Sequence, residues 1–210
     1  MSLLGALGTI AVITVIYEGG IELRQNHERH SYFNQARDYA DSVGKPLLTV
    51  GMKRRFWEPS DGDVTIDIDP EVEKIEGGVI ADVRSIPFED KYFGACYCSH
   101  VLEHMETVED AQRAVDECVR VSDISVFLCP SPYSIIGNFF CPAHHLRIWF
   151  DPLLNRIRVK DNSFRTGIGP ASKGQYENKG IGQALVSRDS PEIVKIENAI
   201  VLEPNGATIL

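Results

Sequence analysis

Short apolar runs that alternate with polar loops constrain the fold of this 210-residue chain most strongly. The runs are LLTV (47–50), VTIDI (64–68), VIA (79–81), ACYCS (95–99) and ISVFLC (124–129). Before the last run, residues 107–121 carry apolar side chains at helical spacing. Short strands that are apolar throughout, with helices between them, are typical of a parallel sheet covered on both faces. The sequence therefore predicts a doubly wound, mostly parallel α/β fold.

Polar residues follow several of these runs. In an open parallel sheet, ligands bind beyond the carboxyl ends of the strands. The candidate site residues are therefore Gly51, Asp67, Asp69, Asp82 and the segment 99–104.

The segment 82–121 also carries an ordered set of motifs. They are Asp82, Ile86-Pro87-Phe88, Asp90, Phe93, Val101-Leu102-Glu103-His104, Glu117 and Arg120-Val121. This order resembles class I S-adenosylmethionine-dependent methyltransferases of the small-molecule "LEH" type. In that family the third strand ends in an acid before LPF-x-D-x-x-F, the fourth leads into V-LEH, and the next helix ends in E-x-x-R-V. With the upstream strands, the resemblance covers about residues 45–150.

The resemblance implies a role for each matching residue. Asp67 would accept hydrogen bonds from the ribose hydroxyls of S-adenosylmethionine. Asp82 and the backbone of Val83 would hold the adenine, and Gly51 is what remains of the glycine-rich turn. His100 would line the cofactor and substrate pocket. The residues alone also allow Asp67 to be a solvated loop carboxylate and Asp82 to be a cap.

His100, Glu103 and His104 are the catalytic candidates, as a general-base cluster. Methyl transfer depends on orientation, and a base is needed only if the nucleophile must lose a proton. His104 could instead fix its loop by a hydrogen bond. His145, in the run PAHHLR (142–147), matches a segment that borders the substrate pocket in LEH-type relatives and is the substrate-binding candidate.

Metal binding is not expected from the spacing. Cys141, His144 and His145, with Cys129 or Cys98, are zinc-type ligands, but their spacing fits no standard motif. The five cysteines are odd in number and lie in apolar segments, which indicates reduced, mostly buried thiols on the cytosolic side of a membrane.

The loop after the first run departs from the family. Where relatives have D-x-G-x-G-x-G, this chain has MKRRFW (52–57) after Gly51, and Gly94 stands where they often have Asp. We expect the loop to fold away from the sheet or to fill part of the methionine pocket, with weak cofactor affinity. Its residues 53–55 could meet an anionic group or form a solvated turn.

The N-terminal residues 1–20 form a separate apolar segment. Residues 2–17 carry no charge, which predicts a transmembrane helix that anchors the chain through residues 3–17 on the cytoplasmic side; a buried helix or strand is the alternative. Gly19-Gly20 is expected to end it. An amphipathic helix is predicted over 21–44, with its apolar stripe at Leu23, Tyr32, Phe33, Ala36, Tyr39, Ala40 and Val43.

The C-terminal part is predicted from composition and turn signals. A methyltransferase-like domain is expected over 45–165, a mobile Gly- and Ser-rich loop over 166–183, and closing strands over 184–210. Asn205-Gly206 is predicted to form the hairpin turn.

A net charge of −9 argues against nucleic-acid partners, which need a basic surface. The sequence predicts an S-adenosylmethionine-dependent methyltransferase that acts on a small or lipid-linked acceptor, with a membrane surface as a possible partner. The alternative is a catalytically inactive methyltransferase-like binding or scaffold protein.

Overall fold

The computed structural model describes residues 3–131, 133–137, 141–151, 156–161, 191–196 and 199–204. Its elements are α1 (Leu3–Val43), β1 (Leu47–Val50), β2 (Val64–Asp67), η1 (Pro70–Lys74), β3 (Gly78–Ile80), β4 (Phe93–Ser99), η2 (Leu102–His104), α2 (Val108–Val121), β5 (Ser122–Leu128), β6 (Leu146–Asp151), β7 (Arg156–Asp161), β8 (Pro191–Ile196) and β9 (Ala199–Pro204).

The main sheet has the strand order β3-β2-β1-β4-β5-β9-β8. The first five strands in this order pair in parallel, whereas β9 is antiparallel to both β5 and β8. The strands β6 and β7 form a separate antiparallel pair. The parallel core confirms the predicted doubly wound α/β fold.

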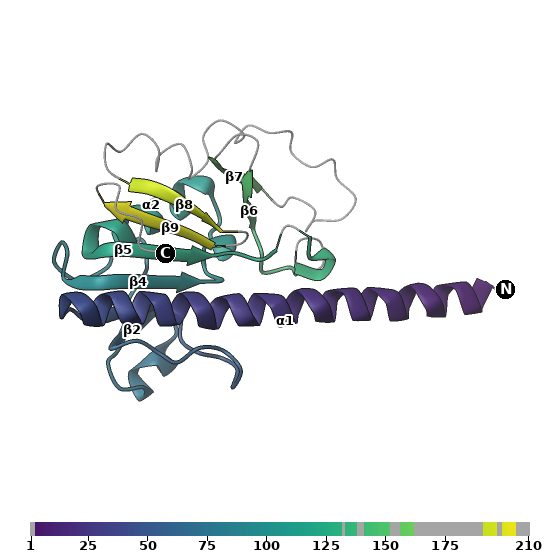
Figure 1. Cartoon of the computed structure of the whole chain (residues 1–210), viewed down its shortest axis with the longest axis horizontal. Helices are drawn as coiled ribbons and strands as arrows, with labels where there is room; N and C mark the ends of the chain where they lie inside the picture. Colours follow the sequence, from purple (N-terminus) through teal and green to yellow (C-terminus); the bar gives the residue numbers. More distant parts are fainter. Residues whose placement is uncertain are drawn as a thin grey trace.

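The two faces of the sheet have separate cores. On one face, Tyr32, Phe33, Ala36 and Ala40 of α1 pack against alternate residues of β4 and β5, and Figure 1 shows α1 running along this sheet. On the other face, the apolar side of α2 packs against the residues between them, among them Cys96 and Cys98. Because successive side chains of a strand point to opposite faces, the apolar run at 95–99 supplies both cores.

Gly94 lets α1 approach the sheet closely. A Cβ atom at this position would lie 2.8 Å from the Cα atom of Ala40 and 2.9 Å from Cγ2 of Val43. The helix therefore explains why glycine stands where the resembled family often has Asp.

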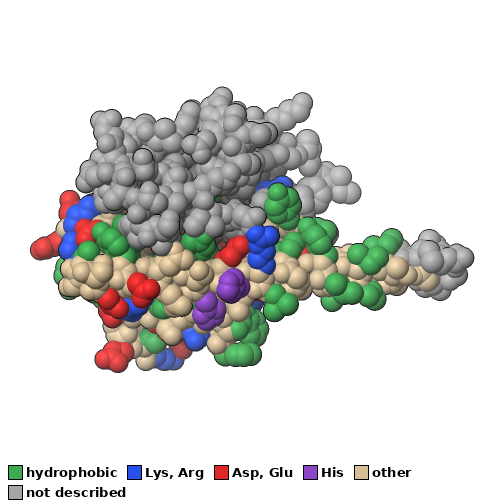
Figure 2. All heavy atoms as spheres, in the orientation of Figure 1, with side chains coloured by type: hydrophobic (Ala, Val, Ile, Leu, Met, Phe, Trp, Pro, Cys, Tyr) green, Lys and Arg blue, Asp and Glu red, His purple; other side chains and the backbone are tan. Residues whose placement is uncertain are grey.

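The N-terminal half of α1 differs from the prediction. The helix continues without a break through Gly19-Gly20, and Leu23 is exposed rather than part of the buried stripe. Figure 2 shows apolar side chains along the part of α1 that extends beyond the sheet. Exposed side chains there include Ile10, Val12, Ile13, Val15 and Ile16, so the alternative of a buried element is also wrong.

The predicted membrane anchor over residues 3–17 is wrong, and so is the membrane localisation that followed from it. Among the described residues, no helix combines the length and the apolarity needed to cross a membrane. The uncharged run is short, and because α1 is continuous, Glu18 and Glu22 follow that run within the same helix.

The C-terminal strands β8 and β9 form an antiparallel pair in which Ile196 lies opposite Ala199. The predicted hairpin turn at Asn205-Gly206 and the predicted mobile loop over 166–183 lie outside the described residues.

Candidate cofactor site and active site

A cavity of about 800 Å³ lies at the carboxyl ends of β1, β2 and β4 and beside the residues that follow β3. The structure brings all five predicted cofactor residues to its wall: Gly51, Asp67, Asp82, Val83 and His100. They meet because the carboxyl ends of parallel strands share one edge of the sheet.

The turn after β1 needs a single glycine. Gly51 has φ +87°, and its N–H donates to the carbonyl oxygen of Ile66 over 2.8 Å. A Cβ atom there would lie 3.2 Å from Cγ2 of Val101. No residue of the loop 52–57 has a positive φ, so this loop keeps its path without the glycines of the resembled family.

One part of the loop 52–57 lies at the cavity wall, and another part projects away from it. Met52, Lys53 and Arg54 line the cavity, whereas the side chain of Phe56 is 87% exposed and stacks edge-to-face on Trp57. The basic part of the loop therefore stays at the site, while Phe56 projects away from it.

Asp67 lies at the end of β2 and fixes the loops around it. Its carboxylate accepts from the N–H groups of Met52 and Asp69, each over 2.9 Å, and Nη2 of Arg54 lies 3.4 Å away. Arg54 also donates to Asp69 over 3.0 Å. The N–H of Glu71, followed by Arg54, holds the pKa of Asp69 below its usual value.

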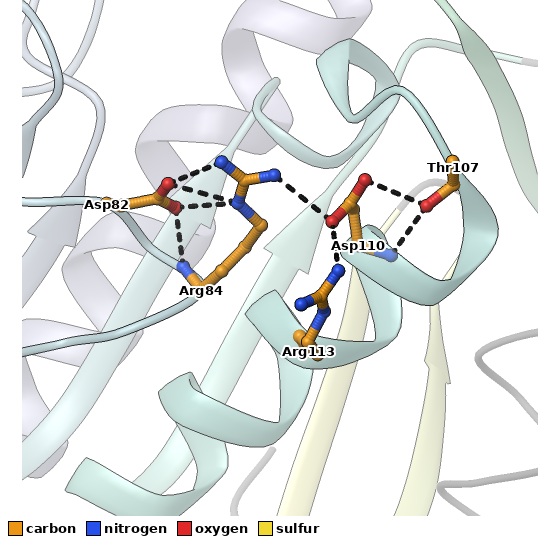
Figure 3. Close-up of polar contacts among 5 residues, drawn as sticks. All are labelled: Asp82, Arg84, Thr107, Asp110 and Arg113. Atoms are coloured by element: carbon orange, nitrogen blue, oxygen red, sulfur yellow. Dashed lines mark hydrogen bonds and ion pairs between the residues drawn. The ribbon is translucent and has the colours of Figure 1, made fainter.

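Asp82 is held by Arg84 instead of standing alone (Figure 3). Nε of Arg84 lies 2.9 and 3.0 Å from the two carboxylate oxygens of Asp82, and this pairing lowers the pKa of Asp82. Arg84 also donates to Asp110 over 3.1 Å, and Thr107 and Arg113 contact the same carboxylate. Asp82, the candidate for binding adenine, is thereby linked through Arg84 to Asp110 in the first turn of α2.

Arg29 is a site residue that our sequence analysis missed. It is 7% exposed, lines the cavity from α1, and its Nη2 lies 2.9 Å from Nε2 of His100. Its Nε is buried and has no hydrogen-bond partner among the described residues. The sequence did contain a signal for a functional role of Arg29. Gln25 and Arg29 lie at helical spacing on the same side of the helix as Ala36, where a helix that packs on a core is normally apolar.

The predicted catalytic residues lie together at one wall of the cavity. His100 and His104 line the cavity, and Glu103, which is 1% exposed, lies behind them. Nδ1 of His100 is 3.2 Å from Oε1 of Glu103. Burial alone would raise the pKa of Glu103, but His100 and His104 outweigh that effect and lower it.

The segment 141–145 closes the far side of this cluster. His145 does not line the cavity; its N–H donates to the carbonyl oxygen of Glu103 over 2.7 Å. Nδ1 of His104 lies 2.9 Å from the carbonyl oxygen of Ala143. This hydrogen bond fixes a loop, which is the structural role that was the alternative to catalysis for His104. The ring of His144 packs edge-to-face on that of His104.

Several of the motif residues are structural. Arg120 donates to the carbonyl oxygens of Ile86 and Phe88 and to the carboxylates of Asp90 and Glu117. These bonds fasten the loop after β3 to the end of α2, so this part of the motif set positions the cavity wall without touching the cavity.

The fold and the cavity define a Rossmann-like α/β protein with a cavity at the carboxyl edge of its sheet. Residues 62–124 match the family model described as a methyltransferase domain. This segment of the chain is therefore similar to methyltransferase domains, in agreement with the motif resemblance over residues 82–121.

Solved structures of similar fold include known methyltransferases. An S-adenosylmethionine-dependent methyltransferase from Archaeoglobus fulgidus is 17% identical, with 84% of this chain and 93% of that chain covered and a TM-score of 0.44. The N-methyltransferase NodS from Bradyrhizobium japonicum WM9, in complex with S-adenosyl-L-homocysteine, is 18% identical, with 48% and 60% covered and a TM-score of 0.34. The present chain thus spans less than two thirds of NodS. No functionally curated protein matches the sequence.

Proposed function

We propose that this protein is an S-adenosylmethionine-dependent methyltransferase that acts on a small-molecule acceptor. The observation that carries the proposal is the position of Asp67, which lies beside the Gly51 turn at the wall of a cavity. The matched segment 62–124 contributes a little more than half of the residues that line this cavity. The proposal is restricted to a small-molecule acceptor because the cavity has a volume of about 800 Å³.

The residues present fit the cofactor. Its ribose offers two vicinal hydroxyl donors, and the Asp67 carboxylate has acceptor capacity beyond the N–H groups that it already holds. Its amino-acid end carries a carboxylate, and the Nε of Arg29 is a buried donor that has no partner among the described residues. Gly51 has no side chain to obstruct the approach of a ligand. When bound, S-adenosylmethionine supplies a methyl group on a positively charged sulfur.

His100 is positioned as the group that receives a proton. Arginine can only donate, so Nε2 of His100 must accept from Arg29, and the proton of the neutral ring is on Nδ1, next to Glu103. A ligand carboxylate that bound Arg29 through both Nε and Nη2 would compete for the Nη2 donor and release Nε2 of His100. Cofactor binding would thereby make His100 available as a base to the acceptor.

One observation favours the second candidate, an inactive binding protein. Arg54 contacts Asp67, and Arg84 holds both carboxylate oxygens of Asp82, so arginines already occupy the two acids that the cofactor would use. A protein of this kind would retain the fold and bind a partner without transferring a methyl group.

Calorimetric titration of the full chain with S-adenosylhomocysteine tests the proposal. We expect saturable binding, and we expect Asp67→Asn to weaken it by roughly tenfold or more, because a charge-assisted acceptor is lost. Asp38→Asn, on the exposed side of α1, is the matched control and should leave binding unchanged.

A methyl-transfer assay distinguishes an active methyltransferase from an inactive binding protein. Purified chain is incubated with methyl-labelled S-adenosylmethionine and a panel of small amines, phenols and carboxylates. Labelled product with at least one acceptor supports the methyltransferase. Binding without product from any acceptor supports the inactive protein, and absence of binding overturns the cofactor site itself.

A further inference from the structure

Glu103 is a buried carboxylate whose oxygens accept no well-aligned hydrogen bond from the described residues. It is 1% exposed. The contact with Nδ1 of His100, at 3.2 Å, is an ion-pair distance to one oxygen only. A buried charged group of this kind is costly unless a cation or a donor compensates it.

Two histidines present their rings to this carboxylate. Nδ1 of His104 lies 2.9 Å from the carbonyl oxygen of Ala143, and Nδ1 of His144 lies 2.7 Å from that of Gly137. A carbonyl oxygen only accepts, so in both rings the proton is on Nδ1. In its neutral form, each ring would therefore carry its lone pair on Nε2. Backbone carbonyls fix the tautomers of metal-ligating histidines in the same way.

The three side chains converge. One ligand atom from each of Glu103, His104 and His144 lies within 4.8 Å of the other two. Nε2 of His144 is 4.0 Å from Oε1 of Glu103, which is too long for a hydrogen bond. Metal–ligand bonds are about 2.0–2.2 Å, so small side-chain movements would bring all three to one ion.

We propose that Glu103, His104 and His144 bind a divalent transition-metal ion of the zinc type. Imidazole and carboxylate ligands suit this class of ion, and three protein ligands leave positions open for water or another ligand. Because His104 also lines the cavity, the ion would stand at its wall. The site goes beyond the methyltransferase proposal and is independent of it, since metal binding is measured without S-adenosylmethionine.

Of the zinc-type ligands considered from the sequence, only His144 belongs to this site, and spacing along the chain did not predict Glu103 or His104 as its partners. Its ligands come from η2 and from the segment before β6, and the fold joins these through the bonds from His145 to Glu103 and from His104 to Ala143. The cysteines that suggested a zinc set from ligand type are not part of it.

The test is titration of the chelator-treated full chain with Zn²⁺ by calorimetry. We expect one ion per chain. Glu103→Gln, which keeps the shape of the side chain, and His144→Gln should each weaken binding at least tenfold. His104→Gln is a further variant that tests the metal site, because this exposed ring can be replaced without disturbing the core. His27→Gln, an exposed histidine of α1, is the matched control and should bind as the wild type does.

Two further measurements make the result decisive. Zn²⁺ should raise the melting temperature of the wild type and of His27→Gln, but not that of the ligand variants. Absence of binding, or equal binding by all variants, would overturn the site. Loss of Zn²⁺ binding in Cys141→Ser would show that a thiolate site, and not the proposed set of ligands, binds the ion. His144 does not line the cavity, so unchanged binding of S-adenosylhomocysteine by His144→Gln would show that a failed metal site leaves the cofactor proposal standing.

Discussion

Nη2 of Arg29 lies 2.9 Å from Nε2 of His100 and joins α1 to the end of β4 across 71 positions of the chain. The contact sets the tautomer of His100 and keeps a guanidinium group buried at the cavity wall. It makes α1 part of the site as well as a cover for the sheet.

Arg29→Ala should weaken binding of S-adenosylhomocysteine by roughly tenfold or more, because a buried charged donor is lost. Arg29→Lys should recover only part of the affinity, since an ammonium group lacks the guanidinium fork. Calorimetry measures both, with thermal unfolding to confirm that the variants fold. Arg24→Ala, an exposed arginine of the same helix, is the control. Equal affinity in Arg29→Ala and Arg24→Ala would remove Arg29 from the cofactor site.

Arg54→Ala should leave the affinity for S-adenosylhomocysteine unchanged or raise it by up to about fivefold. The arginine is half exposed and competes with the ribose for Asp67, and exposed ion pairs contribute only about 0–1 kcal/mol. Calorimetry at two salt concentrations measures the effect. Weaker binding by the variant would show instead that Arg54 contacts the ligand.

Two glycine substitutions should have opposite effects on stability. Gly94→Ala places a Cβ atom 2.8 Å from Ala40 and should cost about 1–3 kcal/mol of unfolding free energy through overpacking. Gly20→Ala meets nothing within 4 Å inside α1 and should stabilise the helix by up to about 1 kcal/mol. Urea unfolding followed by circular dichroism measures both. Loss of helix signal in Gly20→Ala would contradict a continuous α1.

The first turn of α2 should be sensitive to acid through Asp110. Its bonds with Thr107 and Arg84 lower its pKa in the folded state, so its contribution to stability is present above the ordinary value of about 3.9 and is lost as the pH falls through the lowered one. Asp110→Asn should therefore destabilise at pH 7 and much less at pH 2, as measured by urea unfolding.

Two controls accompany the Asp110 substitution. Glu109→Gln, an exposed acid of the same turn, should show little change at either pH. Thr107→Ala removes the cap and should cost about 1 kcal/mol at pH 7. A wild-type advantage over Asp110→Asn that is as large at pH 2 as at pH 7 would contradict the assigned pKa shift.

Patterns of apolar and capping residues over short stretches of sequence predicted the strands of the parallel sheet and the helix α2. The apolar runs gave the five parallel strands, and Thr107 with the periodic residues that follow gave α2. The positions of Asp67 and Asp82 at one edge followed from strand direction alone. The continuity of α1 did not, because two glycines lower the propensity of an isolated helix but do not break one whose flanking turns form.

The sequence by itself determined the sheet, its direction and the edge at which a ligand binds, because alternating apolar runs admit few other arrangements. Only the tertiary structure decided which charged groups meet. Arg29 reaches His100, Arg84 links Asp82 to Asp110, and Glu103 lies against His144 because helices and loops distant in the chain pack together. Spacing along the chain records none of these pairings, since a side-chain contact depends on distance in space.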